Sequence, residues 1–171
     1  MPKFFNKRFP YSWIIAKQKI DVFDAIVRLA DIPKLQPQLI QPVGLINGAF
    51  DLLHASHLRL LNEARWRSGT LVVLLDSDAK VRRLKGDSRP IMLWGERAAM
   101  LFYCGVDLIV EIDTEQEFID AVEYLQPDFR VLGSEYKGRK SRLPHLHTIY
   151  VKDRGPHTST IIERIYPTTN A

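Results

Sequence analysis

Between Asn47 and His57 the chain reads N-G-A-F-D-L-L-H-A-S-H, and the expected fold follows from what lies on either side. The apolar run V-G-L-I at 43–46 precedes it and has the length of a buried strand, whereas a helical pattern of leucines follows it. Gly48 permits a tight turn between the two. Because His54 and His57 are three residues apart, both side chains would project from one side of the helix's first turn.

The remainder of the chain alternates between strand and helix patterns. The run T-L-V-V-L-L at 70–75 is apolar almost throughout, which is typical of a parallel strand covered on both faces. The other predicted strands span 43–47, 108–112, 129–132 and 148–151. The predicted helices span 54–67, 78–84, 96–104, 114–125 and 160–166. Repeated β-α units predict an α/β fold, a doubly wound parallel sheet whose ligands bind at the carboxyl ends of the strands.

The first 42 residues do not fit this alternation. From Asp21 the run D-V-F-D-A-I-V-R-L-A-D-I spaces its apolar residues as a helix does, with Asp21 as the N-cap. The segment P-K-L-Q-P-Q-L-I-Q-P at 33–42 carries three prolines in ten residues and predicts an extended connector. We therefore expect an N-terminal helix and proline-containing arm at 1–42, appended to one domain at 43–171.

Composition narrows the possible functions. With 171 residues, 46% hydrophobic and 26% charged, the chain suits one globular domain. No apolar run approaches the roughly 20 residues of a membrane-spanning helix, and no signal-peptide pattern is present, so we expect a cytoplasmic protein with no membrane partner. The single cysteine, Cys104, excludes an intramolecular disulfide and a cysteine-based zinc site. The 24 Lys and Arg exceed the 20 Asp and Glu only mildly, so we expect no nucleic-acid partner.

The two histidines at the start of a predicted helix indicate an anion site. Free N–H groups and the helix dipole attract anions there. Imidazoles at His54 and His57 could also donate hydrogen bonds to a phosphate whose charge grows during transfer. Two alternatives remain open, which are unrelated polar residues at a helix start and a zinc pair. The zinc pair is less favoured, because such histidines usually lie four residues apart and no third ligand is evident, so we predict no protein-bound metal.

Four segments resemble one family. G-A-F-D-L-L-H-A-S-H at 48–57 resembles the G-x-F-D-x-x-H-x-G-H signature of the cytidylyltransferase-like nucleotidyltransferases. R-L-K-G-D-S-R-P at 83–90 resembles a segment of the heptose-phosphate adenylyltransferases within it. G-V-D-L-I-V at 105–110 and T-S-T-I-I at 158–162 are similar to two further elements of that branch. The resemblance covers about 43–165 and implies a Rossmann-like nucleotidyltransferase fold.

The resemblance also implies a reaction. A substrate phosphate would attack the α-phosphorus of a nucleoside triphosphate in line and displace pyrophosphate, without a covalent enzyme intermediate. His54 and His57 would bind the triphosphate and stabilise the transition state, and Lys85 would contact phosphates from a mobile loop. The β- and γ-phosphates would lie at a second helix N-terminus formed by Thr158, Ser159 and Thr160. Mg²⁺ would be bound through the triphosphate.

Further residues of the nucleotide site are implied in the same way. The turn would contact the nucleotide through Asn47, Gly48, Ala49, Phe50 and Asp51, with Asp51 orienting the turn. Arg89 and Arg97 are candidates for the phosphates, with a surface or salt-bridging role as the alternative. Asp76 and Asp78 follow a strand and are candidates for the nucleotide or the acceptor, with helix capping as the alternative.

The chain departs from the family at three places. Ser56 stands where the family has glycine. L-D-S-D at 75–78 replaces V-N-S-D, and L-G-S-E-Y at 132–136 replaces K-G-G-D-Y. These changes lie near the expected loops for the base or the acceptor, so they bear on the substrate more than on the reaction class.

Three functional hypotheses follow. The first is an adenylyltransferase that joins ATP to heptose 1-phosphate and makes an ADP-sugar. The second is a cytidylyltransferase that joins CTP to glycerol 3-phosphate or a similar polyol phosphate. The third, motivated by Ser56 and the altered loop at 133–136, is a catalytically inactive nucleotide-binding module. The resemblance also suggests a homodimer.

Overall fold

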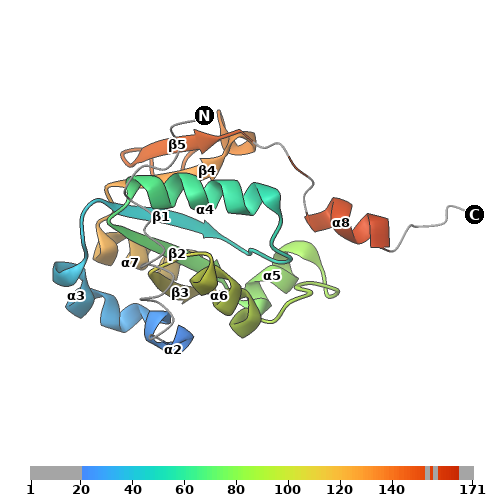
Figure 1. Cartoon of the computed structure of the whole chain (residues 1–171), viewed down its shortest axis with the longest axis horizontal. Coiled ribbons are helices and arrows are strands. Elements are labelled where there is room, and N and C mark those ends of the chain that lie inside the picture. The colour runs from blue at the N-terminus through green and yellow to red at the C-terminus, as the bar shows by residue number, and fades with distance from the viewer. Residues whose placement is uncertain (1–20, 153–154, 156–157, 166–171) are drawn as a thin grey trace, which may run out of the picture.

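The computed structural model describes residues 21–152, 155 and 158–165 and is built on a five-stranded, entirely parallel sheet (Figure 1). The sheet has the order β3-β2-β1-β4-β5. Its strands are β1 Val43–Gly48, β2 Thr70–Asp76, β3 Leu108–Ile112, β4 Phe129–Gly133 and β5 His147–Val151. The chain moves outward from β1 to β3 and then returns to the other side of β1, so the predicted doubly wound sheet is confirmed.

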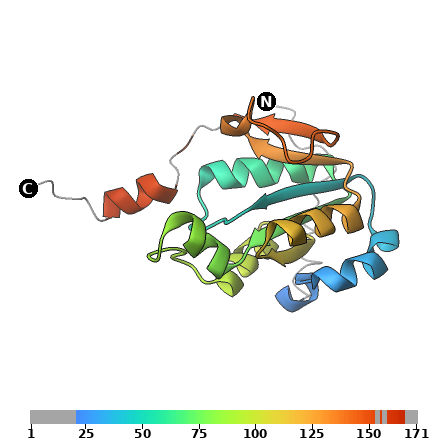
Figure 2. The same cartoon turned by 180° about the vertical axis from the view of Figure 1, so that it is seen from behind.

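Helices cover both faces of the sheet, as Figures 1 and 2 show from opposite sides. α4 (Ala55–Arg67) and α6 (Trp94–Tyr103) pack on one face, and α7 (Glu115–Leu125) packs on the other. β2 supplies both layers, because Leu71, Val73 and Leu75 point into the first core and its intervening residues into the second. All of its positions from 70 to 75 are buried, as a strand covered on both faces requires.

The remaining main-domain elements lie close to their predicted bounds. α5 (Asp78–Lys85) follows β2, and α8 (Thr158–Ile165) begins two residues earlier than predicted. The capping box at the start of α7 is present, since Thr114 Oγ1 accepts from the Glu117 N–H and Glu117 accepts from the Thr114 N–H, both at 3.1 Å. No helix within the described ranges is long and apolar enough to cross a bilayer.

The predicted helix from Asp21 is wrong beyond its first turn. α2 spans only Val22–Ala25, and Ile26 then adopts an extended conformation and forms a parallel bridge with Ile109 of β3. The Val27 N–H donates to the Ile109 carbonyl at 2.9 Å. β3 is an edge strand whose polar backbone groups need partners, and this pairing outweighs the helical spacing of the apolar side chains.

The predicted extended connector at 33–42 is also wrong over most of its length. A 3₁₀ turn at Leu29–Asp31, a short helix α3 at Ile32–Leu35 and a second 3₁₀ turn at Gln36–Gln38 follow one another. Two of the prolines stand at the start of these turns, where proline is tolerated because the missing N–H would have no helical partner.

The described part of the N-terminal segment packs into the domain rather than extending away from it. Ala25 is 3% exposed and belongs to the core under α4 and α6, and Ile32 is 2% exposed and belongs to the core under α7. The division at 42/43 stays a prediction. Residues 1–20 of the predicted arm lie outside the described residues.

Candidate active site

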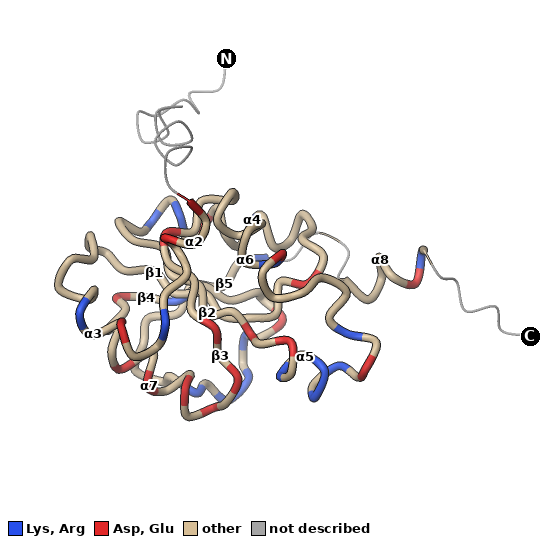
Figure 3. Tube along the Cα trace, turned by 90° about the horizontal axis from the view of Figure 1, so that it is seen from below, with Lys and Arg blue, Asp and Glu red and all other residues tan. Residues whose placement is uncertain are grey.

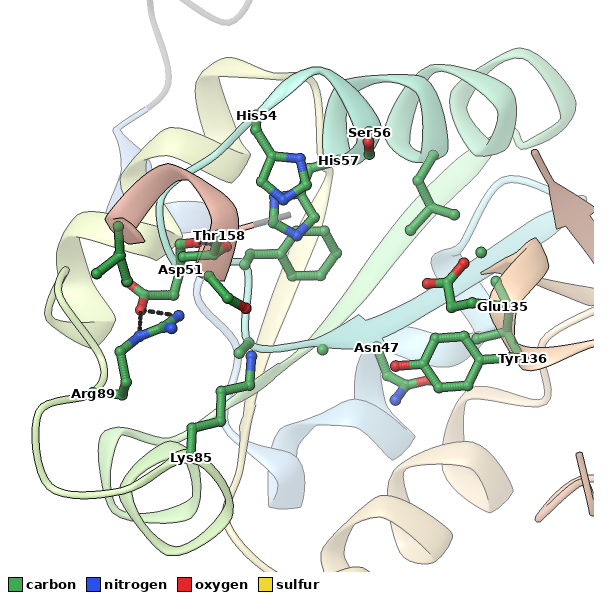
Figure 4. A pocket seen from close by; sticks show the side chains of 18 of the residues that line it. Asn47, Asp51, His54, Ser56, His57, Lys85, Arg89, Glu135, Tyr136 and Thr158 are labelled. Atoms are coloured by element: carbon green, nitrogen blue, oxygen red, sulfur yellow. Dashed lines mark hydrogen bonds and ion pairs between the residues drawn. The ribbon is translucent and has the colours of Figure 1, made fainter. Parts of the chain in front are cut away.

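A pocket of about 660 Å³ opens at the carboxyl ends of β1, β4 and β5 (Figure 4). It lies where the strand order reverses between β1 and β4, which is where doubly wound sheets bind ligands. Eleven of the predicted site residues line it: Asn47, Gly48, Ala49, Phe50, Asp51, His54, His57, Lys85, Arg89, Thr158 and Ser159. The pocket therefore brings together residues that are more than one hundred positions apart in the chain.

The turn between β1 and α4 forms one wall and has an unusual backbone. Phe50 and Leu52 adopt positive φ angles of 51° and 52°, which non-glycine residues rarely do. Such a conformation persists only when its surroundings fix it. Asp51, which lies between the two, provides the fixing contacts.

Asp51 is buried and its carboxylate is surrounded by donors. The Arg89 side chain contacts Oδ2 through Nε and Nη2, each at 2.6 Å, and the N–H groups of Ile91 and Met92 donate at 3.0 Å. Burial alone would raise the pKa of the Asp51 carboxyl, but the Met92 and Ile91 N–H groups and Arg89 together hold this pKa below its ordinary value. Asp51 therefore ties the turn to the loop that follows α5.

The same turn also forms a hydrogen bond with the first residue of α8. The Thr158 hydroxyl donates to the Asp51 carbonyl at 2.6 Å, and Thr158 is buried. This contact brings the N-terminus of α8 to the pocket, where Thr158 and Ser159 line the wall. Thr160 does not line it.

Arg97 supports the turn from outside the pocket. Its side chain is fully buried and donates to the Ala49 carbonyl, to the Met92 carbonyl at 3.1 Å and to Asp78 Oδ1 at 2.7 Å. Asp76 pairs in turn with Lys80 at 2.8 Å. The three predicted residues Asp76, Asp78 and Arg97 thus take part in internal ion pairs and do not line the pocket. Ser77, not either aspartate, caps α5.

His54 and His57 lie together at the start of α4. Their rings stack with centroids 3.8 Å apart, and the Phe50 ring lies 5.1 Å from that of His57. His54 is the N-cap residue, so the positive end of the α4 dipole lies beside it, and this end of a helix attracts anions. The arrangement is the one expected from the H-x-x-H spacing.

Lys85 is the last residue of α5, a helix that Figure 3 shows with basic residues along it. Figure 4 shows its ammonium group directed into the pocket. Burial by the surrounding atoms lowers the pKa of Lys85, and the charge on Arg89 lowers it further, whereas Asp51 and Asp76 act in the opposite direction. A bound anion would restore the stability of its charged form.

Several pocket residues were not among the predicted site residues. Glu135 and Tyr136 belong to a 3₁₀ turn (η3, Ser134–Tyr136) directly after β4, and Lys152 follows β5. Ser56 and Ser88 also line the pocket. For Glu135, Tyr136 and Lys152 the available signal was their position after predicted strands, whereas Ser56 and Ser88 lie inside the segments 48–57 and 83–90. Across the described ranges no group of three or more His, Cys, Asp or Glu side chains is arranged to hold a metal ion.

The family model described as Cytidylyltransferase-like matches residues 45–153. The bifunctional protein HldE of Campylobacter curvus is 42% identical over 131 residues, covering 72% of this chain and 27% of that protein. The bifunctional protein HldE of Helicobacter pylori (strain Shi470) is 37% identical over 134 residues, covering 76% and 29%. The chain thus spans less than a third of the length of these relatives.

Solved structures give the same fold. The lipopolysaccharide core biosynthesis protein from Thermoplasma volcanium GSS1 aligns with a TM-score of 0.51 and 22% identity, over 67% of this chain and 98% of that chain. The pantoate-beta-alanine ligase from Francisella tularensis aligns with a TM-score of 0.57 and 13% identity, over 77% and 68%. At these identities the likeness shows the fold alone.

Proposed function

Because the chain belongs to the cytidylyltransferase-like family, we propose that it transfers the nucleoside monophosphate of a nucleoside triphosphate to a sugar phosphate and releases pyrophosphate. The preferred pair is ATP and heptose 1-phosphate, giving ADP-heptose. The resemblance of 83–90 to the heptose-phosphate adenylyltransferases and the likeness to the HldE proteins favour this pair. CTP with glycerol 3-phosphate is the alternative pair.

One observation carries the proposal. The N-termini of α4 and α8, the His54–His57 pair and Lys85 all face one pocket. Each of these is a donor or a positive charge suited to phosphate oxygens. A triphosphate and a second phosphate together carry several negative charges, so a site for both needs this concentration of donors.

The chemistry then follows from charge and position. An oxygen of the acceptor phosphate forms a bond to the α-phosphorus while the bond from that phosphorus to the bridging oxygen breaks, and pyrophosphate leaves with the electron pair. His54 and His57 donate hydrogen bonds to the oxygens around the α-phosphorus, and Lys85 neutralises charge on the leaving group. Magnesium bound through the triphosphate would supply further charge neutralisation.

A pyrophosphate-release assay tests the proposal. Purified protein with magnesium is given ATP or CTP, each with heptose 1-phosphate or glycerol 3-phosphate. Turnover of ATP with the heptose supports the preferred pair, and turnover of CTP with glycerol 3-phosphate supports the alternative. Absence of pyrophosphate in every combination, together with nucleotide binding measured by calorimetry, would instead favour the inactive nucleotide-binding module.

A further inference from the structure

A surface loop beside the pocket carries positive charge that no described residue neutralises. The segment K-G-R-K at 137–140, called the basic loop below, follows η3 directly. Its cationic side chains, which are all exposed, are Lys137, Arg139 and Lys140. None of these three forms an ion pair with a residue in the described ranges, whereas the nearby Arg142 pairs with Glu115 at 2.6 Å. The basic loop therefore presents three uncompensated charges to solvent.

The basic loop is held in place on both sides. At its start the Lys137 N–H donates to the Ser134 carbonyl at 3.1 Å, which ties the loop to η3. Just after its end the buried Arg130 of β4 donates to Ser141 Oγ at 2.5 Å, which ties the loop to the sheet. The charges of the loop therefore have a defined place relative to the pocket.

That place is the rim of the pocket. The guanidinium carbon of Arg139 lies 5.1 Å from the centroid of the Tyr136 ring, and Tyr136 lines the pocket. Figure 4 shows this ring on the side of the pocket away from Lys85. The three cations of the basic loop do not line the pocket themselves. They can therefore attract a ligand that approaches from solution, but they do not contact one that is seated.

Inside the pocket the formal charges cancel. Its described lining residues carry three positive and three negative side chains, which are Lys85, Arg89, Lys152, Asp51, Glu135 and Glu163. The attraction of the helix N-termini falls off within about one turn, so it acts on a phosphate only after entry. Exposed charges act farther, over about 30 Å at 0.01 M salt and about 8 Å at physiological ionic strength. Long-range attraction of an anion must therefore come from charges outside the pocket.

We propose that the basic loop attracts polyphosphate ligands from solution and speeds their entry into the pocket. A charge at the rim of a site changes the association rate and its salt dependence, and the dissociation rate stays the same because the seated ligand is not contacted. This inference rests on the proposed function, because the polyphosphate is the nucleoside triphosphate of that reaction. The loop has no part in the chemical step.

Stopped-flow binding of the fluorescent nucleotides mant-ATP and mant-CTP, with magnesium, tests the proposal. Wild type is compared with the variant Lys137→Gln/Arg139→Gln/Lys140→Gln at about 0.01 M and about 1 M NaCl, where charges act over about 30 Å and about 3 Å. We expect the variant to associate about 3- to 10-fold more slowly at low salt and at the wild-type rate at high salt. Its dissociation rate should equal that of wild type.

A second triple variant is the matched control. Arg28→Gln/Lys34→Gln/Arg67→Gln removes the same net charge from residues whose side chains are 84%, 81% and 53% exposed and that do not line the pocket. Their ion pairs are exposed and contribute less than about 1 kcal/mol each, so the control should stay folded. It should bind both nucleotides at the wild-type rates.

The results separate this inference from the proposed function. Equal association of wild type and the basic-loop variant at low salt, a faster dissociation of that variant, or an equal slowing of the control would overturn the role of the loop. Salt-dependent nucleotide binding without release of pyrophosphate would overturn the proposed function and leave the role of the loop standing. Release of pyrophosphate with salt-independent association would do the reverse. If wild type binds neither nucleotide, both fail.

Discussion

Replacing Asp51 by asparagine removes one charge from the contact that fixes the active-site turn. The Asp51 side chain is 0% exposed and that of its partner Arg89 is 10% exposed. Asparagine has nearly the same shape, so the change leaves packing intact. Its amide nitrogen, however, would face donors on every side, because Arg89, Ile91 and Met92 all donate to this carboxylate.

The expected loss of stability is large for an isosteric change. Removing one partner of a buried ion pair costs about 3–5 kcal/mol, since the other charge stays buried without compensation. A buried donor left without an acceptor costs about 1–3 kcal/mol more. Because Arg89 keeps some contact with solvent, we take the lower limits and expect Asp51→Asn to lower the free energy of unfolding by about 3–4 kcal/mol.

Urea denaturation of wild type, Asp51→Asn and the double variant Asp51→Asn/Arg89→Met measures this cost. The double variant removes both charges and should recover part of the loss. Glu115→Gln is the control, because Glu115 and its partner Arg142 are 53% and 51% exposed and such pairs contribute less than about 1 kcal/mol. A loss below about 1 kcal/mol for Asp51→Asn would refute the reasoning.

The pH dependence gives an independent check. The pKa of Asp51 is lower in the folded than in the unfolded protein, so its contribution is complete above the ordinary aspartate pKa of about 4. It is lost as the pH falls through the lower, folded value. The difference in stability between wild type and Asp51→Asn should therefore shrink below pH 4 and stay constant between about pH 6 and 8.

Four further predictions concern the pocket and a residue beside it. His54→Asn should lower kcat about 10²- to 10³-fold in the pyrophosphate assay. His145 is exposed and does not line the pocket, so His145→Asn should leave kcat unchanged. Equal rates for the two variants would contradict the role of His54. Lys85→Met should weaken ATP turnover in the same assay, because it removes a positive charge from the pocket; unchanged turnover would argue against the role of Lys85. Ser56→Gly should cost about 0.5 kcal/mol in urea denaturation, because glycine costs about 1 kcal/mol in a helix relative to alanine and serine is intermediate, while kcat stays within about threefold. A Cβ at Gly155 would lie 2.8 Å from Ser56 Oγ, so Gly155→Ala should lower stability more in wild type than in Ser56→Gly, and equal losses would show that the two positions are independent.

Local patterns predicted most of the fold. The apolar run of β2 and the Thr114 capping box depend on neighbours in the chain, so their signals are present in the sequence. The predicted Rossmann-like fold is confirmed, and the match of residues 45–153 to the Cytidylyltransferase-like model confirms the predicted family. Both histidines of the H-x-x-H motif line the pocket.

The errors arose where distant segments meet. Ile26 leaves the helical conformation because of Ile109, which lies more than eighty residues away, and no local pattern contains that information. For Arg97 the sequence left a phosphate contact and a salt-bridging role open, and the acceptors that it meets in the core, on the turn and on α5, are distant in the chain. Glu135 was outside the predicted site because a single acid in a loop has no distinguishing pattern until Gly133 is seen beneath it.

The pairing of Ile26 with Ile109 has a consequence for how the protein behaves in a crowded solution. An edge strand with unpaired backbone groups can recruit a strand from another molecule, and this is a common first step of aggregation. The residues around Ile26 occupy part of that edge in β3, and the neighbouring Ala25 and Ile32 cover apolar surface on either side of the sheet. A shortened protein beginning at Val43 would expose both the edge and that surface, and we expect it to self-associate where the longer chain does not.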